Sequence, residues 1–255
     1  MSVSLPHAIA VWRRNASMYR RTWMLNILPN FFEPVLYLAA MGLGVGNYVR
    51  AMGGLPYVAF LAPGLVCVAA MNGASFEVTY NIYVRMNFEK QYDAMLTTPV
   101  EPQDVLAGEV LWAVTRSCIY GGAFFIVVVC FGLAPSAWAL LALPVIPLTG
   151  LLFAAIGLAF TLRLNNIDLF SFYFTLFLTP LFLFSDIFFP LQERLSGMWL
   201  WVAEVLPLLH PVRIARLAFR GEFAAVMGWD VAYLLLLSTL LLAWALRTVR
   251  QRLTN

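Results

Sequence analysis

Apolar residues gather in six long stretches along the chain, and short polar segments separate them. Each stretch holds roughly 20 mostly apolar residues, the length at which an α-helix crosses a bilayer. The predicted spans are residues 27–46, 57–80, 105–131, 138–162, 167–189 and 229–246. The sequence lacks the short alternating segments of a porin-like barrel. The pattern therefore predicts an all-α integral membrane protein with six transmembrane helices.

An amphipathic helix is predicted before the first span, within residues 1–26. One face of this helix carries a row at helical spacing that includes Ile9, Trp12, Tyr19 and Trp23, while arginines form two other rows. Such a helix lies in the inner membrane interface, with its arginines toward lipid phosphate. It acts either as a passive anchor or as a lever that moves during function.

The polar segment after the second span, residues 85–104, is predicted to begin with a short helix over residues 85–96. Phe88 and Tyr92 share one face of that helix, and Pro99 follows its end. Proline disfavours the helical conformation in the residue before it. A short amphipathic helix between two spans either docks a soluble partner or is a solvated connector.

The segment between the last two spans, residues 190–223, is too apolar for a free loop. Pro207 and Pro211 interrupt it, so it does not cross the membrane as one straight helix. We expect two short helices, 195–206 and 211–220, that dip into the outer leaflet as a hairpin. Three basic side chains at helical spacing then form one basic edge: Arg213, Arg216 and Arg220.

Among the ionisable residues inside predicted spans or at their ends, four are singled out: Glu33, Glu77, Arg116 and Asp186. Charges at such positions are costly and need a partner or a function. A proton relay would place several of them at one depth, whereas these four are scattered. Polar contacts between helices are therefore favoured over a relay, and Glu77 with Arg116 is the predicted ion pair.

Composition excludes a soluble fold. Hydrophobic residues make up 62% of the 255 residues and charged residues 11%, against about 45–50% and about 25% in soluble domains. The net charge of +3 and the lack of a basic run with interleaved aromatics argue against nucleic-acid binding. Ten basic residues lie on the predicted side of the two termini and five on the opposite side, which places both termini in the cytoplasm.

Catalytic and cofactor motifs are missing from the sequence. The chain has no GxxxxGK[ST] loop, so it does not hydrolyse ATP by that route. Its three cysteines show no CxxC spacing, which argues against a zinc site or a disulfide framework. The two histidines, His7 and His210, belong to no catalytic arrangement, and His210 is predicted to be structural. We expect no cleavable signal peptide, no metal and no cofactor in this chain.

The order of elements and two sequence strings resemble the membrane subunit of type 2 ABC exporters. The strings are LTTPVEPQDVLAGE at 96–109 and FPLQERLSGMWLWVAEVLPLLHPVRIAR at 189–216. Within that family, the closest resemblance is to the nodulation-protein branch, whose members export lipo-chitooligosaccharides. The strings that carry it are VWRRN at 11–15, YVAFLAPGLV at 57–66 and ALPVIPLTGL at 142–151.

The resemblance implies a homodimeric permease in the cell inner membrane, with each copy docking one separate ATPase subunit that binds ATP and Mg²⁺. Spans one, two and five would line the dimer seam and the path of an amphiphile moving outward: a lipo-oligosaccharide, a polysaccharide, a lipid or a drug. The residues implied in coupling to the ATPase are Arg85, Phe88, Glu89, Tyr92 and Asp93. Those implied in an outer gate are Trp199, Pro207, His210, Arg213 and Arg216.

Two other classes remain as alternatives from the residues alone. A proton-coupled secondary carrier for a hydrophobic solute would show inverted repeats and carboxylates at the membrane midplane. A membrane transferase would need clustered acid, base or nucleophile groups at one interface. The aromatic residues of span five either pack against lipid and core or form an apolar slide for the transported amphiphile.

Overall fold

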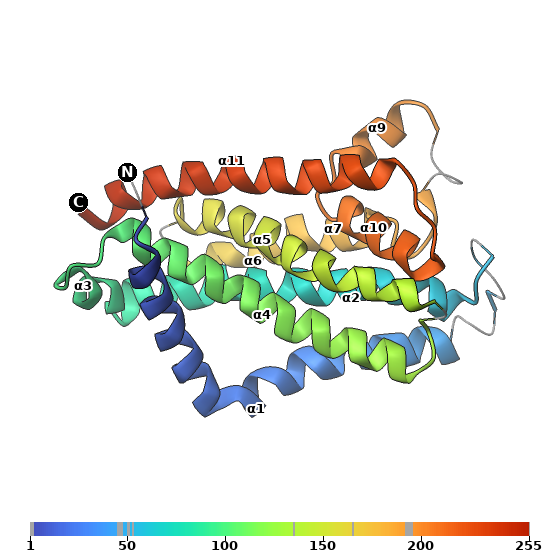
Figure 1. Ribbon diagram of the computed structural model, residues 1–255, viewed down its shortest axis with the longest axis horizontal. Helices are drawn as coiled ribbons and strands as arrows, with labels where there is room; N and C mark the ends of the chain where they lie inside the picture. Colours follow the sequence, from blue (N-terminus) through green and yellow to red (C-terminus); the bar gives the residue numbers. More distant parts are fainter. Residues whose placement is uncertain are drawn as a thin grey trace.

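The computed structural model is an elongated bundle of helices (Figure 1). It describes residues 3–44, 48–49, 52, 54–134, 136–164, 166–191 and 196–254. In this part of the chain no strand forms, and the predicted all-α membrane fold is confirmed. Five helical segments are long and apolar enough to cross a membrane: Tyr57–Phe88, Pro102–Cys130, Ala137–Thr161, Ile167–Phe184 and Val226–Val249.

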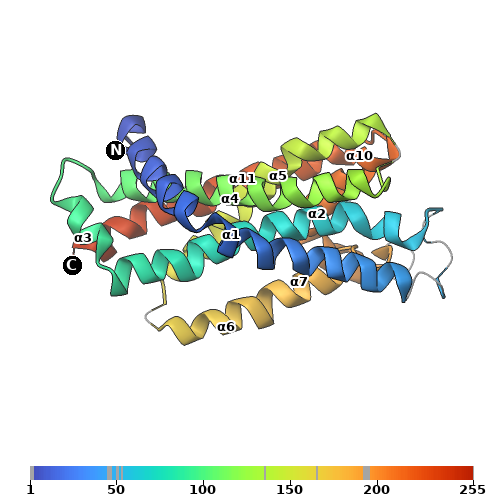
Figure 2. The ribbon, with the colours of Figure 1, turned by 90° about the horizontal axis from the view of Figure 1, so that it is seen from below.

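The first helix, α1 (Leu5–Leu43), contains both the predicted N-terminal helix and most of the first predicted span. Thr22 has non-helical backbone angles, φ −123° and ψ 16°, and α1 bends there. The part before the bend crosses the bundle obliquely, and the part after it runs along the bundle (Figures 1 and 2). We call residues 5–21 the N-helix. The side chain of Glu33 lies outside the described part of the structure.

The second span is the core of the bundle and ends later than predicted. α2 (Tyr57–Phe76) continues through two π-helical stretches, η2 (Glu77–Asn81) and η3 (Val84–Phe88). Within its most apolar stretch 83% of the residues are buried, against 22% for the span Ile167–Phe184. The second predicted span is therefore enclosed by other helices, while the fifth predicted span, Ile167–Phe184, exposes most of its apolar surface.

The prediction of one helix over 85–96 is wrong. Residues 85–88 complete η3, and Lys90 then takes a left-handed conformation with φ +48°. A non-glycine residue in that region ends a right-handed helix. A separate short helix, α3 (Gln91–Leu96), follows the break. Phe88 and Tyr92 therefore lie on different helices and share no face.

Of three further spans, the first two pack on α2, and the last packs on these two. They are α4 (Pro102–Cys130), α5 (Ala142–Thr161) preceded by η4 (Ala137–Leu141), and α11 (Val226–Thr254). The segment between α5 and the hairpin contains η5 (Ile167–Leu169), α6 (Phe170–Phe172), η6 (Tyr173–Leu178) and α7 (Thr179–Phe184). Small residues bring the helices together: a Cβ on Gly150 would lie 2.4 Å from the Ser117 side chain.

The predicted hairpin forms two short helices, α9 (Met198–Glu204) and α10 (Leu209–Arg220), bent by 90° at the break between them. By length and composition the pair would count as a sixth span if it crossed as one unit. Figure 1 shows α9 projecting from one end of the bundle, while α3 and both chain ends lie at the opposite end. The two predicted functional segments are thus separated by the length of the bundle.

Candidate coupling and gate sites

Four buried charged side chains meet at the end of the bundle that holds the termini, and we call them the N-helix network: Glu77, Arg85, Glu109 and Arg116. Arg85 Nη1 donates to Glu109 at 3.0 Å (Oε1) and 2.7 Å (Oε2), and Arg85 Nη2 donates to Glu77. Arg116 Nη1 lies 3.6 Å from Glu77 Oε2, so the predicted pair is in contact. Two positive and two negative charges balance, which makes their burial tolerable.

The N-helix is held against α4 by polar contacts along its length. The Asn15 amide donates to Glu109 Oε2 at 3.0 Å, and the Trp12 indole donates to Thr115 Oγ1 at 2.9 Å. His7 Nδ1 lies 3.1 Å from Asp104 Oδ2. The Asn15 contact ties the N-helix, through Glu109, to the same network that Arg85 joins.

The buried face of the N-helix differs from the predicted row of Ile9, Trp12, Tyr19 and Trp23. Ala8, Val11 and Asn15 are the buried residues, Ile9 is only partly buried, and Trp23 is exposed. The packing partner decides the face: a Cβ on Gly108 of α4 would lie 2.6 Å from Val11 Cβ and 2.7 Å from the Ala8 carbonyl. The missing side chain of Gly108 therefore admits the N-helix.

The five residues implied in coupling divide into two layers. Phe88 is 66% exposed, and Glu89 and Asp93 are also exposed, so these three can contact another subunit. Arg85 is buried in the N-helix network, and Tyr92 is 4% exposed. Burial raises the pKa of the Tyr92 phenol well above its ordinary value, so the ring stays neutral. Arg85 and Tyr92 thus support the surface that the other three form.

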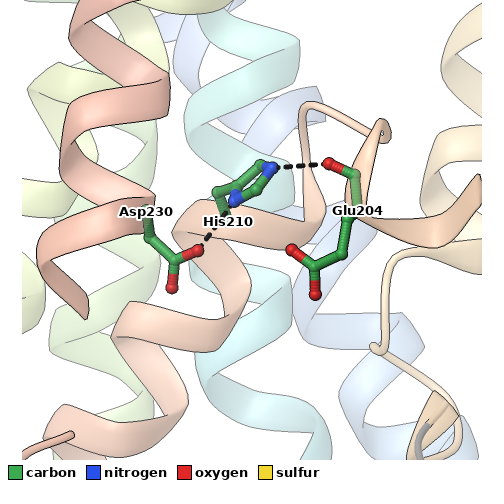
Figure 3. A group of neighbouring side chains, drawn as sticks. All are labelled: Glu204, His210 and Asp230. Atoms are coloured by element: carbon green, nitrogen blue, oxygen red, sulfur yellow. Dashed lines mark hydrogen bonds and ion pairs between the residues drawn. The ribbon is translucent and has the colours of Figure 1, made fainter. Parts of the chain in front are cut away.

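A second group of charged and polar side chains lies at the opposite end, and we call it the hairpin cluster: Glu204, His210, Arg213 and Asp230. Figure 3 shows three of them, Glu204, His210 and Asp230. His210 Nδ1 lies 2.7 Å from Asp230 Oδ1, and His210 Nε2 donates to the Glu204 carbonyl at 2.9 Å. Arg213 Nε donates to Asp230 Oδ2 at 2.9 Å, and Arg213 Nη2 donates to Glu204 Oε2 at 2.9 Å. The cluster joins α9, α10 and α11.

Three side chains of the cluster, Glu204, His210 and Asp230, offer ligand atoms within 4.8 Å of one another, a spacing that suits a metal ion. The Arg213 guanidinium already donates to both carboxylates and would repel a cation there. We therefore interpret the cluster as an ion-paired lock on the hairpin. The sequence analysis did not single out Glu204 or Asp230. Asp230 could have been identified, because a charged residue inside a predicted span (229–246) needs a partner or a function.

The prediction of one basic edge from Arg213, Arg216 and Arg220 is wrong for the first two residues. Arg213 is paired within the hairpin cluster, and Arg216 donates to the Asp186 carboxylate and to its backbone carbonyl. Arg216 also stacks 3.9 Å from the centre of the Phe60 ring. Helical spacing predicted that these arginines share an edge, but acidic residues of other elements pair with Arg213 and Arg216.

Three further predicted residues remain to be placed: Asp186, predicted inside a span, and Pro207 and Trp199, implied in the gate. Asp186 follows α7 with φ +62°, and its Oδ1 accepts a hydrogen bond from the Leu191 amide at 2.7 Å. Pro207 is buried at the break between α9 and α10, while Trp199 is exposed on α9. The structure therefore brings His210 and Arg213 together and leaves Trp199 apart.

The fold and its charge groups define a polytopic helical membrane protein whose buried ion pairs join separate helices of one bundle. Comparison with known families identifies the kind of membrane protein: the ABC-2 type transporter family matches residues 7–219. The chain belongs to this family of ABC transporter membrane proteins, and it is the membrane-spanning permease of an ABC exporter.

Relatives match over most of the chain. Nodulation protein J of Sinorhizobium fredii is 38% identical over 208 residues, 82% of this chain and 79% of the relative. Nodulation protein J of Rhizobium leguminosarum bv. trifolii is 37% identical over 214 residues, 84% of this chain and 81% of the relative. The inner membrane transport permease YadH of Escherichia coli is 24% identical over 242 residues, 93% of each.

Proposed function

We propose that two copies of this permease assemble with two separate ABC ATPase subunits and move an amphiphile outward across the inner membrane. ATP and Mg²⁺ bind to the ATPases, and no covalent chemistry takes place in this chain. Family membership supports an ATPase partner in general. The observation that carries the coupling proposal is the exposed surface of Phe88, Glu89 and Asp93 above buried Arg85.

The coupling step follows from that layering. A force on η3 and α3 reaches Arg85, which is bonded to Glu77 on the same span and to Glu109 on α4. Glu109 also accepts a hydrogen bond from Asn15 of the N-helix. Movement of the docked ATPase would therefore shift the second span, α4 and the N-helix together and open a path for the substrate.

Phe88→Ala tests the docking surface. We expect the purified permease to lose the ATPase subunit and its ATP turnover while keeping its own melting temperature, because the side chain is exposed. Phe131→Ala is the matched control, since Phe131 is also 66% exposed but follows α4 at the far end of the bundle. Equal retention of the ATPase by both variants would overturn the docking assignment.

The fifth predicted span, Ile167–Phe184, supplies the surface that contacts the second permease copy. Phe172, Leu176, Leu183 and Phe184 are all exposed apolar residues of this span. In a background without the native cysteines, Leu176→Cys should form a disulfide between copies under mild oxidation. Leu236→Cys on α11, an equally apolar exposed position, should not. Cross-linking at Leu236 alone would place the dimer seam on α11 instead.

An amphiphilic substrate of the lipo-oligosaccharide type is supported by the nodulation protein J relatives and by the resemblance to their branch. Both termini are proposed to face the cytoplasm, because α3 lies at the same end of the bundle as the chain ends (Figure 1). Inside-out vesicles that contain the complex should take up a labelled lipo-oligosaccharide only when ATP is present. Uptake driven instead by a proton gradient would favour the secondary carrier.

A further inference from the structure

A cavity of about 280 Å³ lies where the N-helix, the end of the second span and α4 meet. Pockets for whole drug-sized ligands measure roughly 300–1,000 Å³, so this one suits part of a larger molecule. The lining side chains combine hydrogen-bonding groups with apolar surface: Asn15, Met18, Tyr19, Thr22, Glu77, Asn81, Val84, Arg85, Glu89, Trp112 and Arg116.

The formal charges of the lining cancel. Glu77 and Glu89 contribute two negative charges, and Arg85 and Arg116 contribute two positive ones. Arg85 is also paired with Glu109 behind the cavity wall, and Glu89 is exposed. A net anion or cation entering the cavity would meet repulsion as well as attraction. A neutral ligand that both donates and accepts hydrogen bonds avoids that repulsion. Asn81 already donates to Glu77 Oε2 at 2.7 Å, so the ligand would use the lone pairs and protons that remain on the carboxylate, amide and guanidinium groups.

One lining group has spare hydrogen-bonding capacity. Arg116 is 5% exposed, and among the described residues its Nε has no hydrogen-bond partner. Buried polar groups without a partner are rare and call for a ligand or water. The guanidinium of Arg116 lies 4.7 Å from the centre of the Tyr19 ring and 5.0 Å from that of Tyr120. Aromatic and hydrogen-bonding surfaces therefore meet at the same point of the cavity.

The surroundings suit an acyl chain that remains in the membrane. Met18 lines the cavity and is exposed, and Trp23 and Met24 expose further apolar surface just past the bend of α1. Arg20 and Arg21 are exposed beside them, as expected for side chains at lipid phosphate depth. An amphiphile could place its polar part in the cavity while its tail stays in lipid.

This cavity is separate from the face of the second span that packs on span five. On that face Phe76 stacks on Phe174 at 4.5 Å, and Tyr80 stacks on Phe174 at 5.5 Å. Glu77, Asn81 and Arg85, by contrast, line the cavity together with the N-helix and α4. A ligand in the cavity would therefore lie outside the proposed dimer seam.

We propose that this cavity binds one uncharged sugar unit of an amphiphile as it arrives from the inner leaflet, before translocation. The inference rests on the proposed function and adds a lateral entry site to it. Its recognition chemistry is a polyhydroxyl or acetamido ring that hydrogen-bonds to Asn81, Glu77 and Arg116 and lies against the Tyr19 ring.

The test uses the permease–ATPase complex in phosphatidylcholine nanodiscs with a diazirine amino acid at position 18 or 24. Met18 lines the cavity and Met24 does not, although both are exposed on α1. The probes are chitotetraose carrying an 18-carbon acyl chain and lysophosphatidylcholine with the same chain. After illumination, mass spectrometry measures the adduct at each position, and ATP turnover is measured on the same preparation.

We expect the acylated sugar to label position 18 about tenfold more than position 24, since one or two hydrogen bonds correspond to that ratio. Excess free chitotetraose should compete, and Asn81→Ala should lower the labelling. Equal labelling at both positions, equal labelling by the lysolipid, or no competition would overturn the site. If ATP turnover stays intact in that case, only this inference fails; if no complex forms, the proposed function fails as well.

Discussion

The two charge groups of this permease are built alike but connect different kinds of elements. The hairpin cluster joins α9, α10 and the start of α11, which are neighbours along the chain, and His210 and Asp230 are fully buried in it. The N-helix network joins α1, the end of the second span and α4, and residues as distant as Asn15 and Glu109 meet there. It also borders a cavity of about 280 Å³.

This difference gives the two groups different roles: the hairpin cluster fixes one arrangement of helices, and the N-helix network passes movement between helices. A buried ion pair costs desolvation energy and contributes mainly by fixing one arrangement. The hairpin cluster is fully buried at His210 and Asp230, and it fixes the far-end hairpin to α11. The N-helix network lies next to open space and to the exposed coupling surface, so its elements have room to move relative to one another. Changes in the hairpin cluster should therefore affect folding most, and changes in the N-helix network should affect coupling most.

Asp230→Asn should have the largest effect on stability. It leaves His210 and Arg213 buried with one acid instead of two, and breaking a buried pair costs about 3–5 kcal/mol. The melting temperature and the monodisperse yield in detergent measure the loss. Asp168→Asn, at an exposed position, should change stability by less than about 0.5 kcal/mol. Equal melting temperatures for the two variants would contradict the lock.

Glu109→Gln should cost less stability and more coupling. Arg85 keeps Glu77 as a partner, so we expect a loss of about 1.5–3 kcal/mol, typical of one charged hydrogen bond. Because Glu109 links Arg85 to Asn15, ATP turnover should become independent of the transported substrate. The exposed Glu222→Gln is the control. A lowered melting temperature with ATP turnover that still responds to the transported substrate would contradict the coupling role of the N-helix network.

Gly108→Ala tests how the N-helix is seated, with a smaller effect on stability. The new Cβ would meet Val11 and the Ala8 carbonyl, and such overpacking costs about 1–3 kcal/mol. Gly122→Ala, on the same helix, has open space at its Cβ and should be neutral or stabilising by up to about 1 kcal/mol. Limited proteolysis should cut the N-helix faster in Gly108→Ala only. Equal cutting in both would show that the N-helix does not depend on this contact.

The sequence predicts the bundle well because long apolar stretches and interrupting prolines have few other solutions in a membrane. It predicts less about where charges meet. Helical spacing placed Arg213 and Arg216 on an edge, yet their partners Asp230 and Asp186 come from other elements. Spacing also extended a helix through Lys90, where the left-handed backbone ends it. Both errors concern tertiary contacts or local conformations that periodicity does not encode.

Tyr92→Phe should have the smallest effect and separates the two layers of the coupling segment. The Tyr92 hydroxyl is buried and has no hydrogen-bond partner among the described residues, so its removal should change stability by less than about 0.5 kcal/mol. Tyr173→Phe is the matched control: its hydroxyl lies 3.3 Å from Ser75 Oγ, and its loss should cost about 1 kcal/mol. Melting temperature and ATPase co-purification measure both. Loss of the ATPase from Tyr92→Phe would mean that the hydroxyl reaches the partner, and that the buried layer of this segment opens when the complex forms.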